Sequence, residues 1–273
     1  MIIYELRRAF TGYGFRIALF ATLCLSALQI CFVPLQYCIG DAWGPWRSGA
    51  YGMPPSVWAS WIGGTPQSVW SVLFYYLVPI LCCAPFTSSA CTDLGGGLAP
   101  VLVSRSSARE YVLSKMLASC VSGVFVFVVP QVLNLLATML LVPLIPPDPV
   151  TLLFPITYRA AAAELYYSSP MLYTLLFFAI GSAFICLLNC ACIACSGRLR
   201  SRLLVLFLPF LGCMLLNFLL GTIDLASYSP ENILSPYQQY PGMSISLVLV
   251  LLTLLLSAVV GYAAIKSQRA DVL

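Results

Sequence analysis

The chain has 273 residues, of which 61% are hydrophobic and only 8% are charged. Soluble domains carry about 25% charged residues, so this composition excludes an ordinary globular domain and indicates a polytopic membrane protein. The formal net charge of +4 gives no reason to expect nucleic acid binding, because the basic residues form short clusters beside apolar runs and no continuous patch. The absence of histidine excludes imidazole zinc sites and His-dependent catalytic triads.

The first segment, 1–13, is predicted to form a short amphipathic helix. Ile2, Leu6 and Phe10 recur at helical spacing, while the charged residues, Arg8 among them, occupy other faces. A helix of this kind lies in the headgroup plane of the inner leaflet with its basic residues near anionic lipid. No small-residue cleavage site follows, so we expect the next run itself to direct membrane insertion.

Six apolar runs follow, and each is long enough to cross about 30 Å of hydrocarbon as a helix. The predicted spans are 15–37, 69–88, 112–144, 171–195, 203–223 and 244–265. Neither a repeat nor a domain boundary divides the chain, so 1–273 is interpreted as one all-α membrane domain.

The basic residues set the predicted orientation. With both termini in the cytoplasm, eleven of the thirteen basic residues fall in cytoplasmic segments, and only Arg47 and Arg159 fall outside. The opposite orientation would invert this ratio, against the positive-inside rule. Both termini are therefore expected to be cytoplasmic.

The predicted outer connections are rich in turn residues and aromatic side chains. Segment 38–68 contains four tryptophans, and 224–243 contains the run SPYQQYP. The tryptophans are Trp43, Trp46, Trp58 and Trp61. Such composition is typical of the membrane interface, so we expect anchoring there, with direct substrate contact as the alternative.

The spans hold neutral polar side chains and almost no ionisable ones. Proton- or ion-coupled transport is therefore disfavoured, and no catalytic residue or metal ligand is predicted. The neutral polar residues are Gln29, Gln131, Asn134, Asn189 and Asn217. Taken singly, each is expected to hydrogen-bond between helices; the alternative is a polar lining for the path of a large amphipathic cargo.

Most of the twelve cysteines fall inside predicted spans, where cysteine behaves as a small hydrophobe. Cys192 and Cys195 form a C-x-x-C at the cytoplasmic end of one span. Packing is the expected role of the pair. A membrane enzyme or sensor that uses these two thiols is the alternative function.

The connector 88–116 carries most of the polar information in the first half of the chain. Asp93 and three glycines precede an apolar block at 98–103, and Arg105, Arg109 and Lys115 follow it. Such a connector cannot sit in lipid, and its basic residues place it in the cytoplasm. We interpret it as the contact with a soluble partner, whose acidic groups these basic residues could pair; the alternative is that the charges only orient the chain.

No phosphate-binding loop is present, because the glycines are not followed by the Lys that such a loop requires. We therefore predict no ATP site and no cofactor in this chain. Any energy source would be a separate polypeptide.

This order of features resembles the membrane subunit of ATP-binding-cassette exporters, the type-2 permease family, over nearly the whole chain. The resemblance rests on the amphipathic N-terminus, the six spans, and a first cytoplasmic loop with an acidic residue, glycine, an apolar block, the pair Ser104-Arg105 and the run EYVLSK at 110–115. Family members usually have Glu where Asp93 stands and a GT-L-like segment in place of the triple glycine.

The resemblance implies a coupling helix near 95–103 that docks in a groove of a cytoplasmic ATPase, which binds ATP and Mg²⁺. It also implies a second permease subunit, identical or different, in the lipid of a bacterial-type plasma membrane. A peptide, drug-like or lipid-like cargo would move outward by alternating access. The residues implied in ATPase coupling are Asp93, Gly95, Gly96, Gly97, Leu98, Pro100, Val101, Leu102, Arg105 and Arg109.

Overall fold

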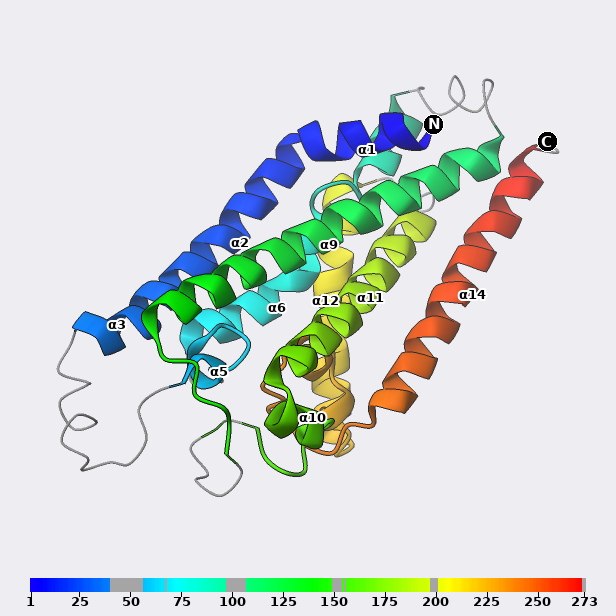
Figure 1. Cartoon of the computed structure of the whole chain (residues 1–273). Coiled ribbons are helices and arrows are strands. Elements are labelled where there is room, and N and C mark those ends of the chain that lie inside the picture. The colour runs from blue at the N-terminus through cyan, green and yellow to red at the C-terminus, as the bar shows by residue number, and fades with distance from the viewer. Residues whose placement is uncertain are drawn as a thin grey trace, which may run out of the picture.

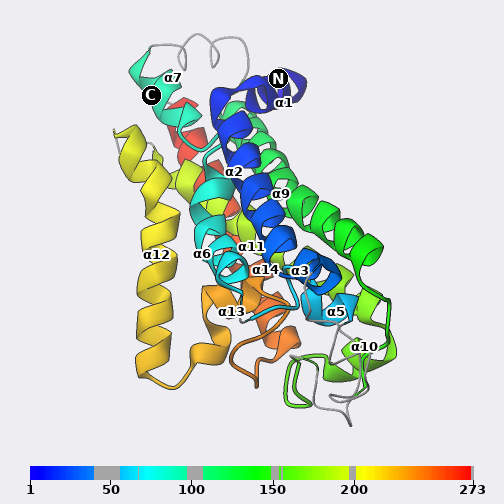
Figure 2. The ribbon, with the colours of Figure 1, turned by 90° about the vertical axis from the view of Figure 1, so that its left-hand side faces the viewer.

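The computed structural model describes residues 1–39, 56–66, 68–96, 107–148, 154, 156–196 and 201–271, and every regular element in these ranges is a helix. The long helices run side by side (Figure 1). The start of helix α1 (Ile2–Thr11), helix α7 (Ser89–Gly95) and the end of helix α14 (Ile245–Asp271) lie at one end of the bundle. Other short helices lie at the opposite end (Figure 2). They are α3 (Pro34–Ile39), α5 (Val57–Ser60), α10 (Ala163–Ser168) and α13 (Pro230–Leu234).

Five of the described helices are long and apolar enough to cross a membrane, which confirms a multi-pass helical membrane protein. They are α2 (Tyr13–Phe32, extended by α3), α9 (Ala108–Leu141), α11 (Pro170–Ser196), α12 (Arg202–Thr222) and α14. Each overlaps one of the predicted spans. Most of α12 and α14 is exposed and apolar, as expected of helices whose outer faces meet lipid.

The helix found at the predicted span 69–88 is shorter than that span. Helix α6 (Val69–Cys83) has 15 residues, roughly 22 Å at 1.5 Å per residue, and turns occupy 84–88 before α7 begins. Pro85 contributes to the early end, because proline has no backbone N–H with which to continue the helical hydrogen bonds, although Ala84 before it still has helical angles. A sixth crossing by α6 stays a prediction.

Helix α9 is the longest element, with 34 residues, about 51 Å at 1.5 Å per residue. Its start is fixed by Ser107, whose hydroxyl accepts a hydrogen bond from the Glu110 backbone N–H at 3.2 Å, as an N-cap residue does. The helix contacts α1, α2, α6, α11 and α14. It is therefore the axis of the bundle.

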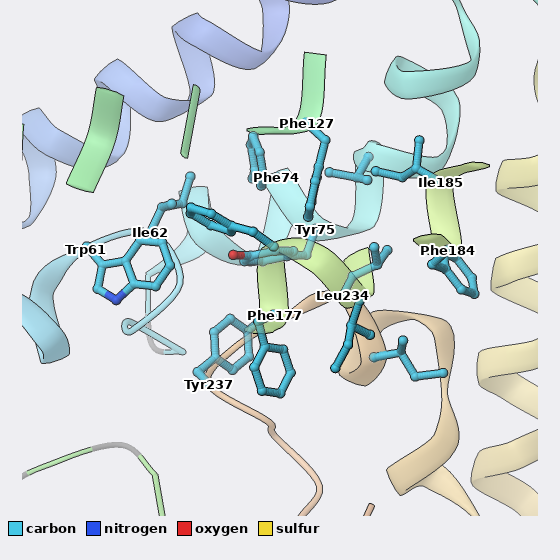
Figure 3. Packing of buried hydrophobic residues seen from close by; sticks show 14 of the residues in the cluster. Trp61, Ile62, Phe74, Tyr75, Phe127, Phe177, Phe184, Ile185, Leu234 and Tyr237 are labelled. Atoms are coloured by element: carbon cyan, nitrogen blue, oxygen red, sulfur yellow. The ribbon is translucent and has the colours of Figure 1, made fainter. Parts of the chain in front are cut away.

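Aromatic side chains fill the centre of the bundle. Figure 3 shows Phe74 and Tyr75 of α6 gathered with Phe127 of α9, Phe177 of α11 and Tyr237. The rings of Tyr75 and Tyr237 meet edge to face with centroids 5.7 Å apart, a favoured aromatic geometry. Tyr237 belongs to the run expected at the interface, so that expectation is wrong for this residue.

The expected interfacial position is also wrong for two tryptophans. Trp58 and Trp61 are only 4% and 2% exposed, because α5 and the turn after it fold into the bundle. The turn is held there by Asn134 Oδ1, which accepts from the Ile62 backbone N–H at 2.8 Å. Gln29 Nε2 also donates to the Ser60 carbonyl at 2.7 Å, which satisfies backbone groups that apolar surroundings would otherwise strand. The other two tryptophans, at 43 and 46, lie outside the described residues.

Gly123 allows α9 to approach two neighbouring helices closely. A Cβ there would lie 2.6 Å from the Cys82 carbonyl of α6 and 2.7 Å from Asn189 Nδ2 of α11. Gly212 of α12 is the opposite case, since nothing lies within 4 Å of its Cβ position.

We predict that Gly123→Ala lowers the free energy of unfolding by about 1–3 kcal/mol, the usual cost of overpacking. Gly212→Ala should leave it unchanged or raise it by up to about 1 kcal/mol, because alanine favours helix. Thermal and denaturant unfolding in detergent would measure both. Equal effects of the two substitutions would contradict the packing.

Candidate functional site

Five ionisable side chains meet beside the start of the segment 97–106. Glu5 and Arg8 come from α1, Asp93 from α7, and Tyr111 and Lys115 from α9. We call this group the Asp93 cluster. Glu5, Asp93 and Lys115 are at most 1% exposed, which is rare for charged residues unless they are paired.

Asp93 is the centre of the cluster. Arg8 donates to both of its oxygens, with Nη1–Oδ2 at 2.8 Å and Nη2–Oδ1 at 2.5 Å. Lys115 Nζ also donates to Oδ2 in a short contact, and the Tyr111 hydroxyl donates to Oδ2 at 3.2 Å. A bidentate guanidinium and an ammonium on one carboxylate are strong, charge-assisted contacts.

Local sequence spacing brings these groups together. Glu5 and Arg8 are three residues apart on α1, and Tyr111 and Lys115 are four apart on α9, so each pair shares a helix face. Gly12 has an extended backbone between α1 and α2, which ends α1 as a separate helix. The charged face of α1 then meets the start of α9.

The pKa of Asp93 shows which effect wins. Burial alone would raise the pKa of this carboxyl, but hydrogen bonds from Arg8 and Lys115, with their positive charges, outweigh it and hold the pKa below its usual value. The hydrogen bond to Asp93 raises the pKa of Arg8, although burial opposes the rise. Asp93 and Arg8 therefore stay ionised across the physiological range.

Lys115 is further stabilised by aromatic rings. Its ammonium lies 4.9 Å from the ring centroid of Tyr111 and 5.2 Å from that of Phe86, within the range of a cation–π contact. Glu5 is held less closely, because its oxygens accept no hydrogen bond among the described residues. Its Oε2 lies 3.6 Å from Lys115 Nζ and 4.0 Å from Arg8 Nη1. It balances the charge of the cluster without a direct bond.

The structure places part of the predicted coupling set. Asp93 is buried on α7, Gly95 ends that helix, and Gly96 is exposed after it, its N–H donating to the Thr92 carbonyl at 2.8 Å. Arg109 is exposed in the first turn of α9. The remaining members lie outside the described residues: Gly97, Leu98, Pro100, Val101, Leu102 and Arg105.

Two charged residues have different roles from those expected. Arg8 was expected near lipid and Lys115 was expected to pair with a partner, yet both bind Asp93 within the chain. Glu5 and Tyr111 also belong to the cluster but are not among the site residues predicted from the sequence. The signal that could have found the cluster is the matched helical spacing of charged and polar side chains on 1–13 and on 110–115.

The candidate path residues make hydrogen bonds inside the bundle. Asn134 Nδ2 donates to Gln29 Oε1 at 2.7 Å, Tyr75 donates to Gln131 Oε1 at 2.8 Å, and Asn189 Oδ1 accepts from Ser119 at 2.7 Å. Gln29, Gln131, Asn134 and Asn189 have no exposed surface. Asn217 is half-buried on α12, and its Oδ1 accepts from the Glu231 backbone N–H at 3.5 Å.

The C-x-x-C pair is split between two environments. Cys192 is buried and packs with Cys83 and Val205, whereas Cys195 is exposed. Among the described residues, no group of three or more His, Cys, Asp or Glu side chains could hold a metal ion.

Comparison with protein-family models, with curated proteins and with solved structures gives no match. What the Asp93 cluster does is therefore inferred from its own geometry. It joins α1, α7 and α9 into one unit at the end of the bundle where the connector begins.

We predict that Lys115→Met destabilises the protein by about 3–5 kcal/mol, because it leaves Glu5 and Asp93 buried with Arg8 alone. Arg109→Met, an exposed change six residues earlier on the same helix, should cost under about 1 kcal/mol. Denaturant unfolding in detergent measures both. A Lys115→Met protein as stable as the control would show that the pairing contributes nothing.

The depressed pKa of Asp93 predicts a loss of stability in acid. Its folded pKa lies below the unfolded value of about 3.9, so its contribution is present above about pH 4 and disappears as the pH falls through the folded pKa. The wild type should therefore lose more unfolding free energy between about pH 5 and pH 2 than Asp93→Asn does. Asp224→Asn, at an exposed site, should keep the wild-type slope; identical slopes in all three would refute the assignment.

Proposed function

We propose that this chain is the membrane subunit of an ATP-driven exporter, and that a separate cytoplasmic ATPase grips its 97–106 segment. The observation that carries the proposal is the Asp93 cluster. It bonds α7, which leads into that segment, to α1 before it and α9 after it. A partner that moves the segment would therefore move three elements together.

The buried ions make this joint stiff. Separating one partner from a buried ion pair costs about 3–5 kcal/mol, so a push on α7 is passed on before the cluster breaks. Helix α9 receives it at Tyr111 and Lys115 and extends through the bundle, in contact with α2, α6, α11 and α14. This chain of contacts supports mechanical coupling between an ATPase and the spans.

The position of the termini supports the proposed topology. The two termini lie at the same end (Figure 1), and a chain with both ends on one side crosses the membrane an even number of times. Five long helices and the shorter α6 would give six crossings. Arg7, Arg8, Arg109 and Lys115 lie at this end, which by the positive-inside rule would be cytoplasmic.

The remaining parts of the proposal follow from the resemblance. A second permease subunit, identical or different, would pair with this one in a bacterial-type plasma membrane. ATP and Mg²⁺ would bind to the ATPase, and a peptide, drug-like or lipid-like cargo would leave the cell. The exposed apolar faces of α12 and α14 leave room for both lipid and a second subunit.

We predict that affinity capture of the tagged chain from its native membranes recovers an ATPase. Leu102→Glu should abolish the recovery, because it places a charge in the apolar block 98–103 that is proposed to contact the ATPase. Leu144→Glu, at an exposed apolar position beyond the far end of α9, should leave it intact. Failure of the wild type to recover an ATPase would contradict the proposal.

A second variant distinguishes binding of the ATPase from the passing of its movement to the spans. Asp93→Asn should still recover the ATPase, but the ATPase rate of the complex should fall at least about fivefold, because α7 is no longer bonded to α1 and α9. Glu110→Gln, an exposed change in the first turn of α9, is the matched control. An unchanged rate in Asp93→Asn would remove the cluster from the mechanism.

A further inference from the structure

The opposite end of the bundle contains another buried carboxylate, which pairs with no cation in the part of the chain that the structure describes. Glu231 stands in the first turn of α13, at the end away from the termini (Figure 2). It is 9% exposed. Every ion pair among the described residues involves Glu5 or Asp93, so none of them neutralises Glu231.

The backbone around Glu231 is fixed by hydrogen bonds. Its N–H donates to Asn217 Oδ1 of α12 at 3.5 Å, and its carbonyl accepts from the Ser235 N–H at 3.0 Å. The Ser229 hydroxyl caps the helix by accepting from the Asn232 N–H. The backbone that carries the carboxylate is thus held in place by α12 and by its own turn.

One carboxylate oxygen of this turn, Glu231 Oε1, is buried and accepts no hydrogen bond among the described residues. The hydroxyls of Ser235 and Tyr237 are buried close by: they interact with each other, and Tyr237 lies within electrostatic reach of Glu231. A buried acceptor without a partner destabilises the fold, and a ligand that donates a hydrogen bond to Oε1 would remove that penalty.

The surroundings are aromatic as well as acidic. The Tyr76 hydroxyl of α6 hydrogen-bonds to the carboxylate, yet burial has the larger effect and raises the pKa of Glu231. The ring of Tyr237 is buried, and Tyr240, 45% exposed, stands at the surface of the same segment. Aromatic rings around a carboxylate favour an organic cation, because the faces of the rings attract positive charge.

We propose that Glu231 binds the ammonium group of an organic amine. The ammonium would form an ion pair with the carboxylate and donate hydrogen bonds to Oε1 and to the hydroxyls of Ser235 and Tyr237, while its hydrocarbon part lies against the tyrosine rings. A divalent metal fits less well, since no second carboxylate joins Glu231 in a metal-binding group of the described residues. Amine binding itself needs no ATPase; only its extension to an exported cargo rests on the proposed function.

The test is titration of the purified chain in detergent with benzylamine, at a pH where the amine is charged, against its neutral analogue benzyl alcohol. We expect benzylamine to bind with a Kd of about 1 mM, as suits one ion pair and one ring, and benzyl alcohol to give no saturable signal. Glu231→Gln should weaken benzylamine binding at least about tenfold. Glu164→Gln, an exposed carboxylate of α10 at the same end, should bind as the wild type does.

Several results would overturn the inference: no saturable binding of benzylamine, equal binding by Glu231→Gln, or the same thermal shift from sodium chloride as from benzylamine, which would indicate an inorganic ion. Glu231→Gln should fold, because it removes a buried charge and keeps the shape. If it cannot be purified, Glu231→Asp, which keeps the charge but shortens its reach, replaces it, and unchanged binding there would equally refute the site. Recovery of an ATPase is a separate readout, so failure here and failure of the proposed function are distinguishable.

Discussion

The bonds from Arg8 and Lys115 to Asp93 decide how one end of this protein is built. A carboxylate without exposed surface is tolerated only because two cations and a tyrosine hydroxyl replace the water it has lost. Each of these groups comes from α1 or α9, so the pairing fixes both helices against α7. Without it, α1 would have little reason to turn a charged face toward the bundle.

Within the bundle, neutral side-chain amides hold neighbouring segments together by hydrogen bonds, as the ion pairs of the Asp93 cluster do at its end. Asn134 accepts from the backbone of Ile62 and donates to Gln29, which donates in turn to Ser60. This chain of bonds allows irregular backbone to lie among apolar helices, where water is unavailable. Four of the five amides that suggest a polar path in the sequence are buried and hydrogen-bonded within the bundle in this structure.

The sequence predicts the long helices well, because run length and charge content depend only on local residues. Prediction from sequence fails for residues whose position depends on a contact with a residue far away in the chain. Trp61 and Tyr237 have the composition of an interface, and the bond that draws 56–64 inward joins residues 72 positions apart. The charges of Arg8 and Lys115 look like orientation signals when each is read alone. Their pairing with Asp93 depends on how three helices meet, which residue type and spacing suggest only in part.

Each end of the molecule contains a buried carboxylate, Asp93 at one end and Glu231 at the other, and their surroundings are opposite. Those of Asp93 suit a rigid contact between helices, and those of Glu231 suit a binding site. Asp93 has two cations, its pKa is lowered, and further bonding would gain little. Glu231 has a tyrosine hydroxyl and no described cation, its pKa is raised, and one of its oxygens is unpaired. A satisfied charge resists being moved, which suits the transmission of force. An unsatisfied one lowers its energy by accepting a cation from outside, so the end away from the termini is where a charged molecule has something to gain by binding.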